Sequence, residues 1–268
     1  MAMTTKECDA IISAARKAGV KLMYLEYYLY YPPMEKAKEL IVKGEIGRPS
    51  IIRVESDSGF GGVSKDFVAN QTKEGMGPSL WRSDKKTGGG SIFDDGVHHF
   101  ALARWLMSRD EKKRNEIKKV FGFFNLETER PGIIVWEHCD GGYGNLSYAE
   151  RAELADVRLM DVHGRYNQLH EAFHVIGTKG TIWVTRCTER MLGEPPVILY
   201  NAEEGKRMTF EDINDDWSDS FTSAVHHFID CVVNDKEPRA TGEDGKKSVQ
   251  VAFAVHKSAR EGKAVEVG

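Results

Sequence analysis

The sequence has little cysteine, no surplus of positive charge and no long apolar run, and each shortage excludes a class of protein. Its 268 residues include 4 cysteines without a Cys-x-x-Cys pair, which argues against a disulfide framework or a zinc ribbon. Lys and Arg number 37 against 41 Asp and Glu, so we expect neither nucleic acid nor a membrane surface as a partner. No apolar run approaches the ~18 residues of a membrane span and no signal-peptide pattern opens the chain, so we expect a cytoplasmic protein.

Several catalytic and nucleotide-binding motifs are also missing. No Gly-x-Gly-x-x-Gly follows a strand pattern, and the glycine-rich residues 59–62 are not followed by the Gly-Lys-Ser/Thr of a phosphate-binding loop. Gly-x-Ser-x-Gly does not occur, so a serine nucleophile of that type has no support. The sequence therefore carries no recognisable dinucleotide-binding motif of its own.

What is present is a pattern of helices followed by many strands. The periodicity predicts a helix over 4–18, with a Thr4–Glu7 capping box, then a short strand over Val20–Leu25. Pro32 is expected to start a second helix that ends at Gly44. Further segments complete the pattern: a strand over 49–56, strands between about 117 and 200, a helix from an N-cap at Ser218, a helix over 244–261 and a short strand over 264–267. This order predicts an α+β fold, a large, mostly antiparallel sheet with helices on one face.

The stretch GGGSIFDDGVHHFALARWLM, residues 88–107, carries the clearest chemical signal. Asp94 and His98 are four residues apart, so on a helix they share a face. A carboxylate beside an imidazole fixes the histidine tautomer and raises its basicity, as proton transfer requires. The same residues also suit a helix start, where an acidic residue complements the helix dipole. The spacing alone leaves both interpretations open.

Other polar residues could complete a site. His163 and His170 flank a turn between two expected strands, and Glu26 opens the tyrosine-rich stretch EYYLYYPP. With His98, these residues could ligate a divalent metal. Tyr28 and its neighbouring tyrosines could be ligands or stacking surfaces, or could simply pack.

Five segments together resemble the Gfo/Idh/MocA oxidoreductases, the glucose–fructose oxidoreductase and inositol dehydrogenase relatives. The matching segments are residues 14–23, 37–49, 80–107, 175–184 and 227–267. The resemblance implies a C-terminal α/β domain built on a large sheet, whose face often serves as an oligomer interface. It also implies that Asp94 orients the substrate or His98, and that His98 is the general acid/base on the hydroxyl being oxidised. The expected substrate-binding residues are Trp81, Arg82, His99, His170, Tyr28 and Glu26.

The chain departs from that family in two places. Relatives carry a Glu-Lys-Pro motif, within a Rossmann domain, just before the segment that corresponds to the first residues here. We therefore expect residues 1–30 to be the remnant of a Rossmann domain and residues 31–268 to be the C-terminal α/β domain. NAD(P) would then have to come from a missing segment or a partner chain. The second departure is EYYLYYPP, where relatives have a Gly-His-Asn-Arg-Arg-Phe type of segment, which would change the pocket wall.

Three functions follow from these observations. The first is a family oxidoreductase acting on a polyol or sugar-like substrate. The second is a cofactor-independent, metal-dependent non-redox enzyme on a related substrate, such as a lyase, dehydratase, isomerase or hydrolase. The third is a non-catalytic binding or oligomerisation subunit. A small-molecule substrate and a homo-oligomer formed through the open sheet face are the expected partners.

Overall fold

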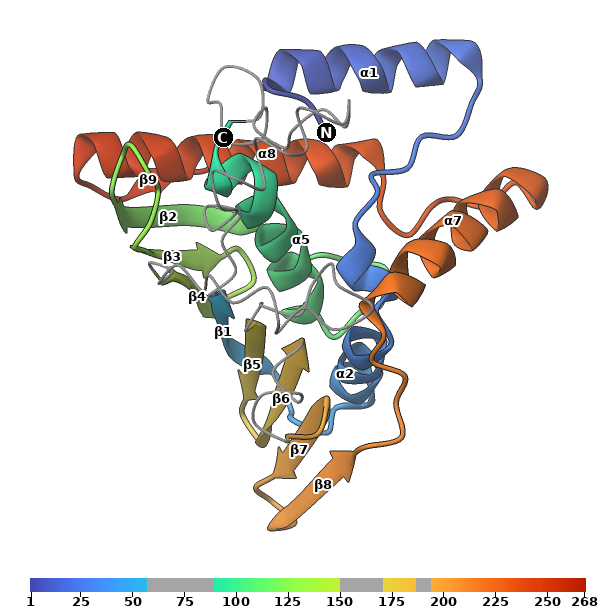
Figure 1. Ribbon diagram of the computed structural model, residues 1–268, viewed down its shortest axis with the longest axis vertical. Helices are drawn as coiled ribbons and strands as arrows, with labels where there is room; N and C mark the ends of the chain where they lie inside the picture. Colours follow the sequence, from blue (N-terminus) through green and yellow to red (C-terminus); the bar gives the residue numbers. More distant parts are fainter. Residues whose placement is uncertain (57–88, 150–170, 187–193) are drawn as a thin grey trace, which may run out of the picture.

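The computed structural model describes residues 1–56, 89–149, 171–186 and 194–268, and its centre is one mixed sheet (Figure 1). The strands follow the order β8-β7-β6-β5-β1-β4-β3-β2-β9. Every pairing is antiparallel except that of β1 with β4, which is parallel. The strands are β1 Pro49–Ser56, β2 Ile117–Phe124, β3 Gly132–His138, β4 Tyr143–Tyr148, β5 Glu171–Gly177, β6 Gly180–Arg186, β7 Val197–Asn201, β8 Lys206–Phe210 and β9 Val265–Glu266.

Helices cover one face of this sheet, with α2, α5 and α8 nearest to it (Figure 1). The helical elements are α1 Thr5–Ala18, the 3-10 helix η1 Tyr27–Tyr30, α2 Pro32–Lys43, the π turn η3 Ile92–Gly96, α5 Val97–Leu106, α7 Trp217–Val233 and α8 Gly242–Glu261. The strand residues that face the helices are apolar and buried, as Ile134 and Trp136 on β3 illustrate. Their neighbours Ile133 and Val135 are 54% and 42% exposed on the other face. The expected α+β fold is therefore confirmed.

Two expected details are wrong, and each has a local cause. Val20–Leu25 is not a strand, because its backbone makes one isolated bridge, between Met23 and Thr241, rather than a ladder. The N-cap of α7 is Asp216 rather than Ser218, since the Asp216 carboxylate accepts the Ser218 backbone N–H at 2.8 Å. An expected strand over 153–164 lies outside the described residues. Within the described part of the chain, no helix has both the length and the apolar character needed to cross a lipid bilayer.

Candidate active site

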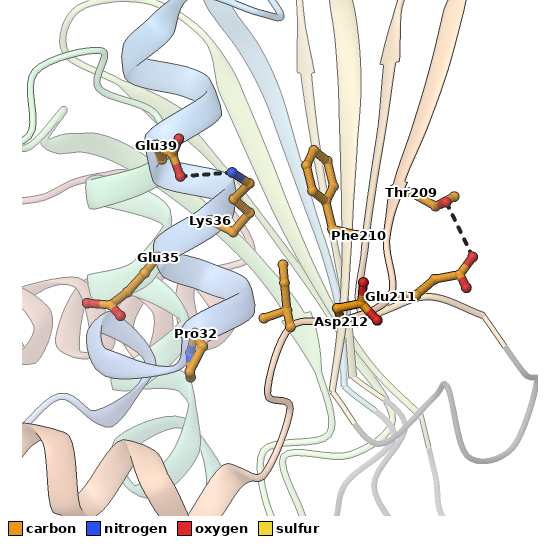
Figure 2. A pocket seen from close by; sticks show the side chains of 9 residues that line it. Pro32, Glu35, Lys36, Glu39, Thr209, Phe210, Glu211 and Asp212 are labelled. Carbon is orange, nitrogen blue, oxygen red and sulfur yellow. Dashed lines mark hydrogen bonds and ion pairs between the residues drawn. The ribbon is translucent and has the colours of Figure 1, made fainter.

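A surface hollow lies between α2 and the end of β8, and two of the acids that line it are held in ion pairs (Figure 2). Glu39 pairs with Lys36 at 3.0 Å, and Glu35 pairs with Arg239 at 2.6 Å. The lining residues are Pro32, Glu35, Lys36, Glu39, Thr209, Phe210, Glu211, Asp212 and Ile213. None of them is a histidine, so a second place, where buried acids and histidines converge, is the better candidate for chemistry.

That second place is created by the sheet topology. Strands β1 and β4 run parallel, so both end at the same edge, and β5 begins there because it runs antiparallel to β1. In this register Ser56 lies opposite Tyr148 on one side and Glu171 on the other. All three residues are buried. A hydroxyl, a phenol and a carboxylate from distant parts of the sequence are thus side by side.

The start of α5 brings two carboxylates and two histidines to this edge. Asp94 and Asp95 lie in the π turn η3, and His98 and His99 lie in the first turn of α5 that continues it. The backbone N–H of Asp94 donates to Gly90 O at 2.9 Å, which starts the helical turn. A π turn inside a longer helix is common at functional sites.

Gly90, just before η3, makes room for a buried acid. Gly90 has φ of 84°, and a Cβ there would lie 2.6 Å from Oε1 of Glu129. The other oxygen, Oε2 of Glu129, accepts the Ile92 backbone N–H at 2.8 Å. Glu129 therefore occupies the space beside Gly90, and it caps the helix that carries the histidines.

His98 is held by Glu26. Its Nδ1 donates to Oε2 of Glu26 at 2.8 Å, while the other oxygen of Glu26 accepts the Tyr28 backbone N–H at 3.4 Å. The Glu26 side chain is fully buried and that of His98 is 27% exposed. Burial lowers the pKa of His98, but the charge and hydrogen bond of Glu26, with the charges of Asp95 and Asp94, raise this pKa above its ordinary value.

His99 lies deeper, between two other carboxylates. Its Nε2 is 3.5 Å from Oε1 of Glu171 and its Nδ1 is 3.9 Å from Oδ2 of Asp95. The ring is 0% exposed, and within the described part of the chain neither nitrogen has a hydrogen-bond partner. The ring centroid of Tyr28 is 6.0 Å from that of His99. The Tyr28 hydroxyl donates a hydrogen bond to Oε2 of Glu171 at 2.6 Å.

Arg130 brings the positive charge beside these acids. Its Nη2 lies 3.6 Å from Oδ2 of Asp95, and its guanidinium is 4.2 Å above the ring of Tyr148. Burial, together with the charge of Asp95, holds the pKa of Tyr148 well above its ordinary value. The phenol is therefore a neutral hydrogen-bonding group at neutral pH.

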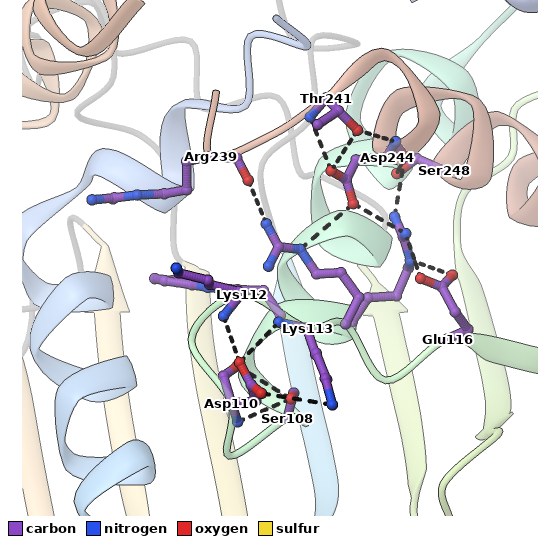
Figure 3. Close-up of polar contacts among 12 residues, drawn as sticks. Ser108, Asp110, Lys112, Lys113, Glu116, Arg239, Thr241, Asp244 and Ser248 are labelled. Atoms are coloured by element: carbon purple, nitrogen blue, oxygen red, sulfur yellow. Dashed lines mark hydrogen bonds and ion pairs between the residues drawn. The ribbon is translucent and has the colours of Figure 1, made fainter. Parts of the chain in front are cut away.

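An ion-pair network fixes the other end of α5. Arg104, buried in that helix, donates from Nε and Nη2 to the two carboxylate oxygens of Glu116, both at 2.8 Å. Its Nη2 also lies 3.4 Å from Asp244, which forms a capping box with Thr241 at the start of α8 (Figure 3). Bidentate arginine contacts are directional, so this network sets the position of the helix that carries His98.

Some of the predicted site residues lie together in the structure, and others fall outside the described residues. One polar cluster contains Glu26, Tyr28, His98 and His99. In this cluster His98 is hydrogen-bonded to Glu26, whereas Asp94 acts on His98 through its charge. Trp81, Arg82, His163 and His170 lie outside the described residues.

Sequence reasoning missed three acids and one cation of the cluster: Asp95, Glu171, Glu129 and Arg130. Two weak signals pointed to the acids, because Asp95 stands next to Asp94 and Glu171 stands next to His170 at a strand start. Nothing in the sequence around Glu129 indicated a helix cap for a segment that begins about 40 residues earlier.

Comparison with known proteins assigns the chain to a family. Residues 38–267 match the family model GFO_IDH_MocA_C, described as oxidoreductase family, C-terminal alpha/beta domain. The chain belongs to this oxidoreductase family.

The individual relatives have low sequence identity to this chain. The chain is 24% identical over 272 residues to D-apiose dehydrogenase of Paraburkholderia graminis, covering 99% of this chain and 64% of that protein. It is 24% identical over 278 residues to myo-inositol 2-dehydrogenase of Thermotoga maritima, covering 100% of this chain and 70% of the relative. A levoglucosan dehydrogenase structure, in complex with NADH and L-sorbose, shares the fold with a TM-score of 0.75 at 17% identity, covering 100% of this chain and 71% of the other.

Proposed function

We propose that the chain binds a sugar or polyol and handles the proton in its oxidation or reduction. The observation that carries this proposal is the hydrogen bond between His98 and the buried carboxylate of Glu26. Family membership supports an oxidoreductase, and the relatives named above act on apiose and inositol. Because the chain spans 64% to 70% of the length of those relatives, the reaction of the whole protein is part of the proposal.

Oxidation of an alcohol removes a proton from the hydroxyl and a hydride from its carbon. With Nδ1–H of His98 donating to Glu26, Nε2 is the nitrogen with a free lone pair, and it takes the hydroxyl proton. The carboxylate of Glu26 stabilises the imidazolium that forms, as in other carboxylate–histidine pairs. In the reverse direction, the same nitrogen returns the proton to the carbonyl oxygen.

The hydride acceptor implied by the relatives is a nicotinamide nucleotide, which the levoglucosan dehydrogenase structure contains. The described residues do not fit one. Their parallel pair is β1 with β4, and neither strand is followed in the sequence by Gly-x-Gly-x-x-Gly. A dinucleotide site would therefore lie outside the described residues, and we assign to this part of the chain only substrate binding and proton transfer.

The proposal can be tested with D-apiose, myo-inositol and levoglucosan. Calorimetry would measure binding of each compound to the purified protein. With the segment or partner chain that supplies the dinucleotide site present, absorbance of reduced nicotinamide would measure turnover with NAD⁺ or NADP⁺. We expect saturable binding of at least one compound and a loss of turnover of about 100-fold or more in His98→Ala. His226→Ala is the matched control, since His226 is exposed on α7. Absence of binding by any of the three compounds, or full turnover in His98→Ala, would refute the proposal.

A further inference from the structure

We propose that Asp95, His99 and Glu171 bind a divalent transition-metal ion, of which Zn²⁺ and Mn²⁺ fit the donors best. Among the described residues, they are the one group of three metal-ligating side chains whose donor atoms lie within 4.8 Å of one another. Asp95 comes from the π turn, His99 from α5 and Glu171 from β5. This site goes beyond the proposed function and does not depend on it.

The first argument is the state of His99. The imidazole is 0% exposed, and neither ring nitrogen has a hydrogen-bond partner among the described residues, although buried polar groups are normally satisfied. The nearest acids, Glu171 at 3.5 Å and Asp95 at 3.9 Å, are too distant for good hydrogen bonds. A buried donor or acceptor left in this state destabilises the fold. A metal bound to a ring nitrogen and to both acids would remove part of that destabilisation.

The second argument is geometric. A metal at about 2.1 Å from each of three donors holds those donors about 3 to 4 Å apart. The three donor atoms here lie within 4.8 Å of one another. Side-chain rotations that move these atoms by about 1 Å or less would therefore close the site around an ion.

The third argument is the support behind the ligands. Tyr28 donates to Oε2 of Glu171 at 2.6 Å, so the carboxylate is oriented with Oε1 toward His99. Ser56 donates to Oδ2 of Asp95 at 3.4 Å. Hydrogen bonds of this kind orient the ligands of metal sites. One imidazole with two carboxylates suits Zn²⁺ or Mn²⁺, because nitrogen favours zinc and oxygen is readily accepted by manganese.

The test is a titration of the full, metal-stripped chain with ZnCl₂ and, separately, MnCl₂. We expect one ion per chain by calorimetry. Glu171→Gln keeps an oxygen that accepts the Tyr28 hydrogen bond but removes the negative charge. Asp95→Asn likewise keeps an oxygen that accepts the Ser56 hydrogen bond and removes the charge. Each change should raise the dissociation constant about tenfold or more, as should His99→Gln. His256→Gln is the matched control, since His256 also faces a buried acid, Glu129 at 3.4 Å, but belongs to no group of three among the described residues.

A spectroscopic measurement on the unchanged protein makes the test independent of variant folding. Electron spin echo modulation of the Mn²⁺-loaded chain should show coupling to an imidazole nitrogen, and this signal should be lost in any His99 variant that folds. Stoichiometric binding that the Asp95 and Glu171 changes leave unaffected, absence of the nitrogen signal, or no saturable binding of either metal would each overturn the inference. Since no sugar or nicotinamide is added, these results are separate from the test of the proposed reaction.

Discussion

Nδ1 of His98 and Oε2 of Glu26 are 2.8 Å apart although the two residues are 72 positions apart in the sequence. Glu26 is fixed as the N-cap of η1, where it also accepts the Tyr28 backbone N–H. The acid that orients the histidine is therefore a buried part of the fold rather than an exposed surface group. It replaces the neighbour in the sequence, Asp94, as the partner hydrogen-bonded to His98.

The first prediction concerns this pair. Glu26→Gln keeps an oxygen that accepts the His98 hydrogen bond but removes the charge that stabilises the imidazolium. We expect kcat to fall about 100-fold with KM changed by less than about threefold, because the carboxylate acts on proton transfer rather than on binding. Steady-state kinetics measure both constants. Glu204→Gln, on an exposed turn, is the control and should match the unchanged protein; an unaltered kcat in Glu26→Gln would show that Glu26 has no part in proton transfer.

The second prediction concerns the turn before η3. In Gly90→Ala the new methyl group would lie 2.6 Å from Glu129 at a φ of 84°, so both the backbone and the helix cap are disturbed. We expect a loss of about 3 kcal/mol or more in the free energy of unfolding, measured by urea titration. Gly205→Ala isolates the backbone part, because Gly205 has φ of 61° and its added methyl group would meet no described atom within 4 Å. That control should cost about 1 kcal/mol, and equal losses in both variants would exclude a role for the Glu129 contact.

Elements with strong local signals could be predicted from the sequence. The two prolines at 32 and 33 and the glycine at 44 predict α2, and the β-branched pattern predicts β1 with the bounds that the structure has. β8 escaped prediction because it is a short edge strand whose Lys206 and Arg207 are exposed, so it lacks an apolar alternation. Val20–Leu25 is apolar enough for a strand but has only the bridge at Met23. Strand formation depends on a neighbour, which local sequence does not specify.

The site could be predicted only in part for the same reason. The spacing of Asp94 and His98 shows that both lie near the start of one helix, and the structure confirms this placement. The contacts of Glu26 with His98 and of Glu171 with His99 arise from the parallel pairing of β1 with β4 and from the position of η1. These are long-range consequences of topology, so no local motif could reveal them.

The third prediction concerns the open face of the sheet. Phe123 on β2 lies opposite Ile133 on β3, and their side chains are 75% and 54% exposed. Because such a contiguous apolar surface is costly in water, we expect two copies of the chain to associate through it. Light scattering after gel filtration should give the mass of an oligomer, and Ile133→Glu should reduce it to that of one chain with little change in melting temperature. Val233→Glu, at a 74% exposed position on α7, is the control; a monomeric unchanged protein would refute the association.

The fourth prediction concerns pH and stability. His138 is fully buried, accepts the Trp136 indole N–H on Nε2 at 2.9 Å and has Nδ1 at 2.8 Å from Asn115 O, so its neutral form fits this site. Burial lowers the pKa of His138 to about 4, only partly offset by the hydrogen bond to Asn115. Between pH 6.5 and 4 the unfolded chain therefore binds more protons at this histidine than the folded chain does, and stability falls as the pH falls.

The size of this effect follows from the two pKa values. From pH 7.5 to 4.5, His138 should remove about 2.5 kcal/mol from the free energy of unfolding. Other groups also titrate in this range, so the measurement is the difference between the unchanged protein and His138→Gln, each unfolded in urea at both pH values. Glutamine can accept the Trp136 N–H but does not titrate. We expect the stability advantage of the unchanged protein over the variant to shrink by about 2.5 kcal/mol on acidification; an advantage that stays constant with pH would mean that His138 is protonated equally in the folded and unfolded chains.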